Sequence, residues 1–383
     1  MESLSLSQAR KLILHSQQLP HNKQGGSALS ATLSAIEQLG YIQIDTISVV
    51  QRAHHHTLWN RNPRYDVSHL DSLVASKQVF EYWSHAAAFL PMRDYRYSLP
   101  RKHAFKSGAQ SHWYKRDFQM MDDILKRIEA EGPLLAKDFE GERKTKQGWG
   151  RKPSKHALEN LFMQGDLMIT ARRNFQKVYD LTERVLPDGI DTSRPNDEEY
   201  ARFLITRFLE ANGLGNAIEM SYLLKNTKPL ITSVLKDMVA SGDILEVAIS
   251  DAVYFALPQS LSLLDKPLAK RKAKILSPFD NLLIQRKRAQ FFFDFDYLIE
   301  CYVPEAKRQF GYFSLPVLWN GDLVARMDCK VDKVSSTLVV LHLALEAKLK
   351  NTETFNASLH DELQRFAAFN GCESYRIERT STA

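Results

Sequence analysis

The chain of 383 residues has few cysteines and no long apolar run. Its three cysteines, Cys301, Cys329 and Cys372, are far apart and form no Cys-x-x-Cys pair, which argues against a disulfide framework and a thiolate metal site. No apolar stretch approaches the roughly 20 residues that span a bilayer. The first residues, MESLSLSQARKLIL, have the pattern of an amphipathic helix with charges inside it, unlike a signal peptide. We therefore expect a cytoplasmic protein without a membrane partner.

The composition is that of an ordinary globular protein with a moderate excess of positive charge. Apolar residues make up 44% and charged residues 25%, and the net charge is +6. The length predicts two to four domains. Basic residues recur at expected helix starts and turns, namely Arg151, Lys152 and Lys155, then Arg172 and Arg173. Such recurring clusters indicate a polyanion partner, although any single cluster is more typical of a solvated surface.

Three segments share the order of two or three helices, a glycine, and two short strands around a turn, which is typical of a winged helix. The clearest copy has a short helix at 132–139 and a second helix at 152–163. Its strands are expected at 166–170 and 175–181, with Arg172, Arg173 and Asn174 at the tip of the hairpin. A basic tip is suited to phosphate contacts.

The other two copies are recognised by the same order. In the third copy, which spans about 197–257, helices are expected at 200–209 and 228–239 and strands at 244–248 and 252–256. The first copy, about 5–90, is less regular, with helices near 7–18, 28–38, 57–59 and 67–76.

After residue 274 the sequence becomes rich in β-forming residues, and Asn320-Gly321 is a hairpin signal. We expect strands at 291–295, 298–303, 312–318, 323–329 and 337–343, followed by a helix near 355–369. The predicted fold class is α+β, with tandem winged-helix domains followed by a small mostly-β domain with a C-terminal helix. The predicted domains are 1–130, 131–190, 191–262 and 263–383.

Gly40-Tyr-Ile-Gln-Ile-Asp-Thr-Ile47 carries the main candidate for chemistry. Apolar and polar residues alternate there, which predicts a strand whose two faces differ. Gln43 and Asp45 share one face, so that an amide and a carboxylate can reach the same water molecule. By spacing alone, a half-buried strand with its polar side in solvent is the other interpretation.

Five separated motifs resemble one known family over about residues 5–345. They are 40–47, 81–91 (EYWSHAAAFLP), 172–182 (RRNFQKVYDLT), 276–281 (LSPFDN) and 302–313 (YVPEAKRQFGYF). Together they look like the winged-helix DNA glycosylases of the AlkZ/YcaQ type. The motif at Gln43-Ile44-Asp45 is similar to the Gln-apolar-Asp form of the YcaQ branch.

The resemblance implies a monofunctional DNA glycosylase that excises N7-alkylated purines and unhooks interstrand crosslinks in base excision and crosslink repair. Asp45 would then accept a proton from the attacking water and stabilise the cationic sugar, and Gln43 would orient that water. The expected partner is duplex DNA with alkylated or crosslinked purines, bound by a monomer. Expected DNA-binding residues are His54, His55, Tyr82, Trp83, His85, Arg151, Lys152, Lys155, Arg172, Arg173 and Asn174.

Several alternatives accompany this hypothesis. A non-catalytic winged-helix transcription regulator would have the same domains but no use for a carboxylate aimed at DNA. A nuclease would need clustered carboxylates for Mg²⁺, and the sequence has no such cluster. The run His54-His-His56 has the residue type of a metal site but lacks a second ligand cluster, so we expect no metal and no cofactor. Tyr82 and Trp83 could stack on bases or belong to the core, and His85 could line the site or be structural.

Overall fold

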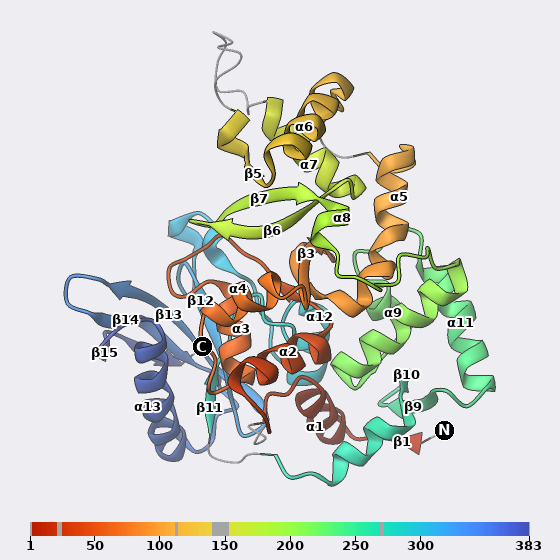
Figure 1. The fold of residues 1–383 in the computed structure, drawn as a ribbon. Coiled ribbons are helices and arrows are strands. Elements are labelled where there is room, and N and C mark those ends of the chain that lie inside the picture. Colours follow the sequence, from red (N-terminus) through yellow and green to blue (C-terminus); the bar gives the residue numbers. More distant parts are fainter. Residues whose placement is uncertain (1, 21–24, 112–113, 140–152, 269–271, 383) are drawn as a thin grey trace. The chain divides into compact units, whose positions relative to one another are not determined.

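The computed structural model describes residues 2–20, 25–111, 114–139, 153–268 and 272–382. Helices and strands are mixed along the whole chain (Figure 1), which confirms the predicted α+β class. Residues 1–65 and 201–383 form one compact unit, and residues 66–200 form the other. Among the described residues, no helix is both long enough and apolar enough to cross a membrane.

The first unit contains most of the described helices, and the first of them begins at a polar cap. The Ser5 hydroxyl accepts the Gln8 N–H while the Gln8 side chain accepts the Ser5 N–H, a capping box that starts the first helix. The helices are α1 (Leu6–Ser16), α2 (Ala28–Leu39), α3 (Ala53–Arg61), α9 (Asp197–Asn212, from the unit boundary), α10 (Ala217–Met220), α11 (Lys228–Ala240), η3 (Pro258–Asp265), α12 (Arg286–Phe293), η4 (Glu300–Tyr302), η5 (Glu305–Lys307) and α13 (Thr352–Phe369).

The strands of this unit form two larger sheets. One has the order β1-β9-β10-β8, in which β1 (Glu2–Ser3) is parallel to β9 (Leu245–Ile249), and β10 (Ala252–Ala256) is antiparallel to both β9 and β8 (Leu214–Gly215). The other sheet runs β11-β12-β13-β14-β15, and β16 also pairs with β14. Its strands are β11 (Ala273–Ile275), β12 (Ser314–Trp319), β13 (Asp322–Asp332), β14 (Thr337–Leu345), β15 (Ser374–Ile377) and β16 (Thr380–Thr382).

The Asn320-Gly321 turn between β12 and β13 is confirmed. Its φ angles are +52° and +84°, the left-handed conformation that a two-residue hairpin turn requires and that Asn and Gly tolerate best. The predicted strands at 312–318, 323–329 and 337–343 correspond to β12, β13 and β14. The predicted C-terminal helix corresponds to α13.

The predicted strands at 291–295 and 298–303 are wrong. Residues 291–293 end the helix α12, and residues 300–302 form the short 3-10 helix η4. Ala289, Phe292 and Phe293 are buried at helical spacing, and they join α1 in the core of this unit. Tertiary burial along one helix face therefore overrides the β-propensity of the phenylalanine run.

The second unit is built from two hairpins and a set of helices. β3 (Val79–Trp83) and β4 (Ala87–Pro91) pair antiparallel, and a small sheet has the order β5-β7-β6. The elements of this unit are α4 (Ser68–Ala75), β3, β4, η1 (Met92–Ser98), α5 (Leu99–Ser107), α6 (Phe118–Glu131), β5 (Leu134–Leu135), η2 (Ala136–Phe139), α7 (Pro153–Gln164), β6 (Leu167–Arg173), β7 (Gln176–Leu181) and α8 (Thr182–Val185).

The tip of the hairpin β6–β7 lies further along the chain than the sequence predicted. β6 continues through Arg172 and Arg173, and the turn consists of Asn174 and Phe175 with φ angles of +50° and +66°. A phenylalanine in this region is rare, since its Cβ crowds the following carbonyl. Arg172 and Arg173 are therefore neighbours in a strand, where successive side chains point to opposite faces.

Lys102 of α5 is buried in the core of the second unit, with 4% of its surface exposed. Its Nζ lies 4.0 Å from the ring centre of Tyr95 and 4.8 Å from that of Tyr82. No acceptor in the described part of the chain forms a hydrogen bond with this Nζ. Burial lowers the pKa of Lys102 to about 7, while the ring faces oppose that shift by favouring the ammonium form.

We expect Lys102→Met to stabilise the protein, because methionine retains the aliphatic chain and removes a buried charge. The free energy of unfolding at pH 7 should rise by roughly 2–4 kcal/mol. The pKa of Lys102 is lowered from 10.5 to about 7, so the native state binds fewer protons than the unfolded state between these values. Wild-type stability should therefore increase with pH through this window, and the variant should lack that increase.

Urea unfolding at pH 7 and pH 9 measures both effects. Lys115→Met is the matched control, since Lys115 is exposed. A Lys102→Met protein that is less stable than wild type at pH 7 would contradict the assignment of a destabilising buried amine.

Candidate active site

The segment that carries Gln43 and Asp45 follows α2 directly. Gly40 ends α2 with φ +78°, and its N–H donates to the Ile36 carbonyl at 2.9 Å. The predicted strand is reduced to two residues, β2 (Ile42–Gln43), so Asp45 lies in the loop that follows. The alternation of burial nevertheless agrees with the prediction, because Ile42 and Ile44 are buried while Gln43 and Asp45 are half-buried.

The Asp45 carboxylate is held by the backbone of its own loop. Its Oδ1 accepts the Ile47 N–H at 2.7 Å. Burial raises the pKa of Asp45 above its usual value, and backbone hydrogen bonds from Ile47 and Thr46 oppose that increase. A carboxylate with a raised pKa accepts a proton more readily than an exposed aspartate, which suits a general base.

Residues 276–281 contact the chain just before this segment and the helix that follows it. The Asn281 side-chain amide donates to the Tyr41 carbonyl at 3.0 Å, two residues before Gln43. Asp280 accepts both Nη atoms of Arg61 on α3, with Nη2 to Oδ1 at 2.8 Å, and both side chains are fully buried. The LSPFDN motif thus contacts both α3, which follows the Gln43–Asp45 segment, and Tyr41, which directly precedes β2.

The charge of Asp45 affects two side chains of η4, Cys301 and Tyr302. The Asp45 carboxylate interacts electrostatically with both side chains, which raises the pKa of each after the larger effect of burial. Tyr302 is 77% exposed.

The three histidines lie on α3 and make structural contacts. His56 is buried, its Nε2 is 2.8 Å from the Ile275 carbonyl, and burial lowers its pKa to about 4. His55 Nδ1 is 2.7 Å from the Tyr65 hydroxyl. His54 is buried, and its ring centre lies 4.2 Å from that of His55. Across the described ranges, no three His, Cys, Asp or Glu side chains are grouped so as to hold a metal ion.

The aromatic candidates of the second unit differ in accessibility. Tyr82 is 1% exposed, its hydroxyl donates to the Met163 carbonyl at 2.7 Å, and its ring packs against Phe162. Its ring is therefore a core residue and offers no free face for stacking on a base. Trp83 is half-buried. His85 is also half-buried, and burial together with the charge of Arg101 lowers its pKa to about 4.

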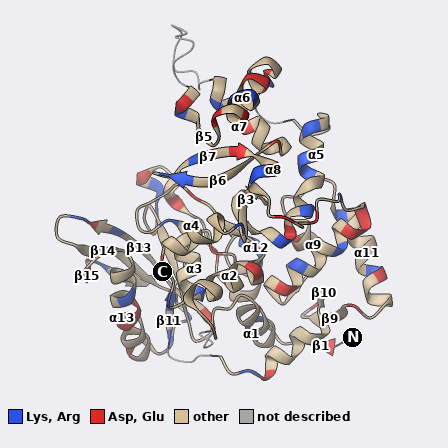
Figure 2. Cartoon of the chain, in the orientation of Figure 1, with Lys and Arg blue, Asp and Glu red and all other residues tan. Residues whose placement is uncertain are grey.

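The DNA-binding candidates near α7 and the hairpin β6–β7 differ in accessibility. Lys155, Arg173 and Asn174 are exposed, and Figure 2 shows the basic end of the hairpin β6–β7. Arg151 and Lys152 lie outside the described residues.

Arg172, by contrast, is engaged inside the second unit. Its Nε and Nη2 donate to the two carboxylate oxygens of Glu81 at 2.8 and 2.7 Å, and Glu81 is only 2% exposed. Its Nη1 donates to the Phe175 carbonyl at 2.8 Å, and its guanidinium lies 4.4 Å from the Phe175 ring centre. Arg172 therefore does not extend from the hairpin tip as the sequence predicted, because it lies in β6 and is paired with a buried acid.

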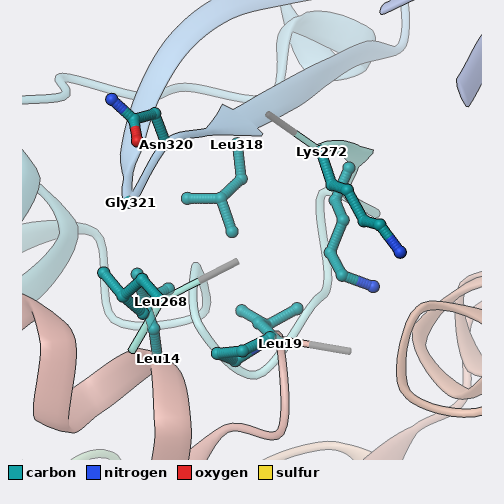
Figure 3. A pocket seen from close by; sticks show the side chains of 9 residues that line it. Leu14, Leu19, Leu268, Lys272, Leu318, Asn320 and Gly321 are labelled. Carbon is teal, nitrogen blue, oxygen red and sulfur yellow. The ribbon is translucent and has the colours of Figure 1, made fainter. Parts of the chain in front are cut away.

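A small hollow of the first unit involves none of these residues (Figure 3). Its volume is about 30 Å³, enough for about one water molecule. It is lined by Leu14, Leu19, Pro20, Leu268, Lys272, Lys274, Leu318, Asn320 and Gly321.

Two comparisons with known proteins agree with one another. A family model described as "DNA glycosylase AlkZ-like" matches residues 36–369, a range that contains Gln43, Asp45 and Tyr302. The fold is similar to the solved structure of the Streptomyces sahachiroi DNA glycosylase AlkZ, with a TM-score of 0.68. That similarity covers 98% of this chain and 100% of that chain at 15% sequence identity.

We expect Arg172→Ala to destabilise the second unit by about 3–5 kcal/mol, because it leaves the buried Glu81 carboxylate without its partner. Arg173→Ala, the neighbouring control, should change stability by less than about 0.5 kcal/mol, since the side chain is exposed. Urea unfolding of both variants measures the difference. Adding Glu81→Gln to Arg172→Ala should recover part of the loss, and equal stability of the two single variants would contradict the assigned pair.

Proposed function

Since the chain belongs to the AlkZ-like DNA glycosylase family, we propose that it hydrolyses the N-glycosidic bond of N7-alkylated purines in duplex DNA, including the unhooking of interstrand crosslinks. The observation that carries this proposal is the half-buried Asp45 carboxylate near Gln43, on a segment held by partly buried hydrogen bonds. A site of this kind offers a proton acceptor and an amide.

The proposed chemistry needs only those two side chains and water. Alkylation at N7 places a positive charge on the purine, so the base is already a good leaving group and requires no strong general acid. The C1′–N9 bond breaks with its electron pair moving to the base, which departs as a neutral alkylpurine. Asp45 stabilises the cationic sugar and takes a proton from the water whose oxygen bonds to C1′, leaving an abasic site.

Gln43 would position the attacking water through its side-chain amide. Neither residue forms a covalent bond to DNA in this scheme, which makes the enzyme a monofunctional hydrolase. Normal guanine is a poor leaving group, so a catalyst of this modest strength leaves undamaged DNA intact.

We also propose how DNA is held. The order of α6, η2, α7 and the hairpin β6–β7 is that of a winged helix, and α9, α11 and the hairpin β9–β10 repeat it. Lys155, Arg173 and Asn174 are exposed on the first of these segments and are suited to phosphate contacts. Among the aromatic and histidine candidates, Trp83, His85 and His55 are only half-buried and are proposed to lie along the DNA.

We expect Asp45→Asn to lower the rate of 7-methylguanine excision by about 10²–10⁴-fold, the usual effect of removing a general base. The fold should be retained, since the two side chains are nearly isosteric. The measurement is a gel assay in which abasic sites are cleaved with base after incubation with a duplex that contains 7-methylguanine. Asp361→Asn, at an exposed position of α13, is the control and should leave the rate unchanged.

Full excision by Asp45→Asn would show that another group activates the water. If the wild-type protein binds this duplex but excises nothing, a non-catalytic DNA-binding role replaces the proposed one.

Excision should be insensitive to excess EDTA, because the proposed mechanism uses a carboxylate, an amide and water. Two of the three histidines of α3, which have the residue type of a metal site, contact other groups: His56 contacts the Ile275 carbonyl and His55 contacts the Tyr65 hydroxyl. The same gel assay with and without chelator measures this. Loss of activity in EDTA that Zn²⁺ or Mg²⁺ restores would contradict the mechanism.

A further inference from the structure

Asn281 is a side chain of the 276–281 motif that contacts the chain just before Gln43. Its Nδ2 donates to the Tyr41 carbonyl at 3.0 Å. The strand β2 begins at the next residue, Ile42, so one residue separates the contacted carbonyl from Gln43. A displacement of the Tyr41 peptide would therefore displace Gln43 as well.

Asn281 projects from a loop that is fixed on both sides. Arg286 donates to the Pro278 carbonyl at 2.9 Å and to the Leu283 carbonyl at 2.8 Å, which joins the chain before Asn281 to the chain after it. The preceding residue, Asp280, is fully buried in its ion pair with α3. The Asn281 amide thus extends from a fixed point, which suits a contact that sets the position of a neighbouring segment.

The chain before this contact is anchored as well. The side-chain amide of Gln38, near the end of α2, donates to the Ser16 carbonyl at 3.1 Å and to the Glu210 carbonyl at 2.7 Å. The Asn281 contact extends this support along the chain to within two residues of Gln43.

Stability alone does not explain an amide at position 281. Its Oδ1 is buried and forms no hydrogen bond within the described part of the chain. Reversing the amide would place Oδ1 against the Tyr41 carbonyl oxygen, so that contact fixes the orientation. A buried acceptor without a partner costs at least as much free energy as one amide hydrogen bond contributes. The amide therefore adds little to stability, and its effect on the position of Tyr41 is the better explanation.

We propose that Asn281 is a positioning residue that sets the place of Gln43 through the Tyr41 carbonyl. This inference rests on the proposed function, in which the Gln43 amide orients the attacking water. A misplacement of about 1 Å in such a group can cost about 10²-fold in rate. Asn281 touches neither the water nor the DNA in this scheme, and it acts by holding the segment that carries the Gln43 amide.

The test measures single-turnover excision of 7-methylguanine from a duplex at saturating protein. Asn281→Leu approximates the shape of the side chain without its amide and should lower the rate by about 10–100-fold. Binding to the same duplex should be unchanged. The melting temperature should stay within about 4 °C of wild type, because the orphaned oxygen is removed together with the hydrogen bond. Asn281→Asp, which replaces the donor with an acceptor, should lower the rate at least as much.

Gln285→Met is the matched control. Gln285 is half-buried like Asn281 and lies four residues further along the chain. Its Nε2 also donates to a backbone carbonyl, that of Glu219, at 2.9 Å. Since this contact does not involve the Gln43 segment, the variant should stay within about 3-fold of the wild-type rate.

A double-variant cycle separates positioning from a general structural role. If Asn281 acts through Gln43, adding Asn281→Leu to Gln43→Ala should change the rate by less than about 3-fold, because no amide remains to be positioned. A larger further loss would show that Asn281 acts elsewhere and would overturn the inference.

The remaining outcomes separate this inference from the proposed function. If the wild-type protein excises 7-methylguanine and either Asn281→Leu or Gln43→Ala does so equally well, the inference is overturned and the proposed function stands. The same holds if Asn281→Leu loses its activity together with more than about 4 °C of melting temperature, since the loss then follows from folding. A wild-type protein that excises nothing overturns both.

Discussion

The buried ion pair between Arg61 and Asp280 is the interaction on which the rest of the proposed site depends. Arg61 ends α3, and its guanidinium also donates to the backbone carbonyl and side-chain amide oxygen of Gln17 beyond α1. Asp280 accepts from Arg61 and from the Leu282 N–H. Losing one partner of such a pair leaves an uncompensated buried charge, at a cost of about 3–5 kcal/mol. The pair therefore holds α3, the helix that follows the Gln43–Asp45 loop, against the chain beyond α1 and against residues 280–282.

The neighbouring polar contacts extend this bracing. Lys274 donates to the Asn60 carbonyl, Asn60 and His56 both contact the Ile275 carbonyl, and burial keeps His56 neutral by lowering its pKa. These groups are buried and hydrogen-bonded to backbone, so they specify one arrangement of α3 against β11. The histidine run, which in the sequence has the residue type of a metal site, is thus explained in part as scaffold for the loop that precedes it.

Local sequence predicted those features that local physics decides. The period-two burial of Ile42 and Ile44, the Asn320-Gly321 turn and the helices α2, α11 and α13 follow from periodicity, caps and turn chemistry. The predicted strand at 291–295 is wrong because the prediction followed the high β-propensity of phenylalanine. The helical spacing of the buried residues Ala289, Phe292 and Phe293 is the sequence signal that favours a helix. The different roles of Arg172 and Arg173 had no local signal, because Glu81 lies 91 residues away in the chain. Tyr82 is a similar case, since only the tertiary fold brings its hydroxyl to Met163.

The half-buried state of Asp45 is a compromise that suits the proposed chemistry. A fully buried carboxylate would be pushed toward its protonated form and could not take a proton from water, whereas a fully exposed one would be a weaker base surrounded by bulk solvent. Partial burial raises the pKa of Asp45, and the N–H groups of Ile47 and Thr46 keep the ionised form favourable. The same partial exposure leaves room for a substrate that carries its own positive charge. In the proposed reaction selectivity would come from the leaving group, because only the alkylated purine departs without help from a strong general acid, so a mild carboxylate would be sufficient and a stronger acid would put undamaged purines at risk.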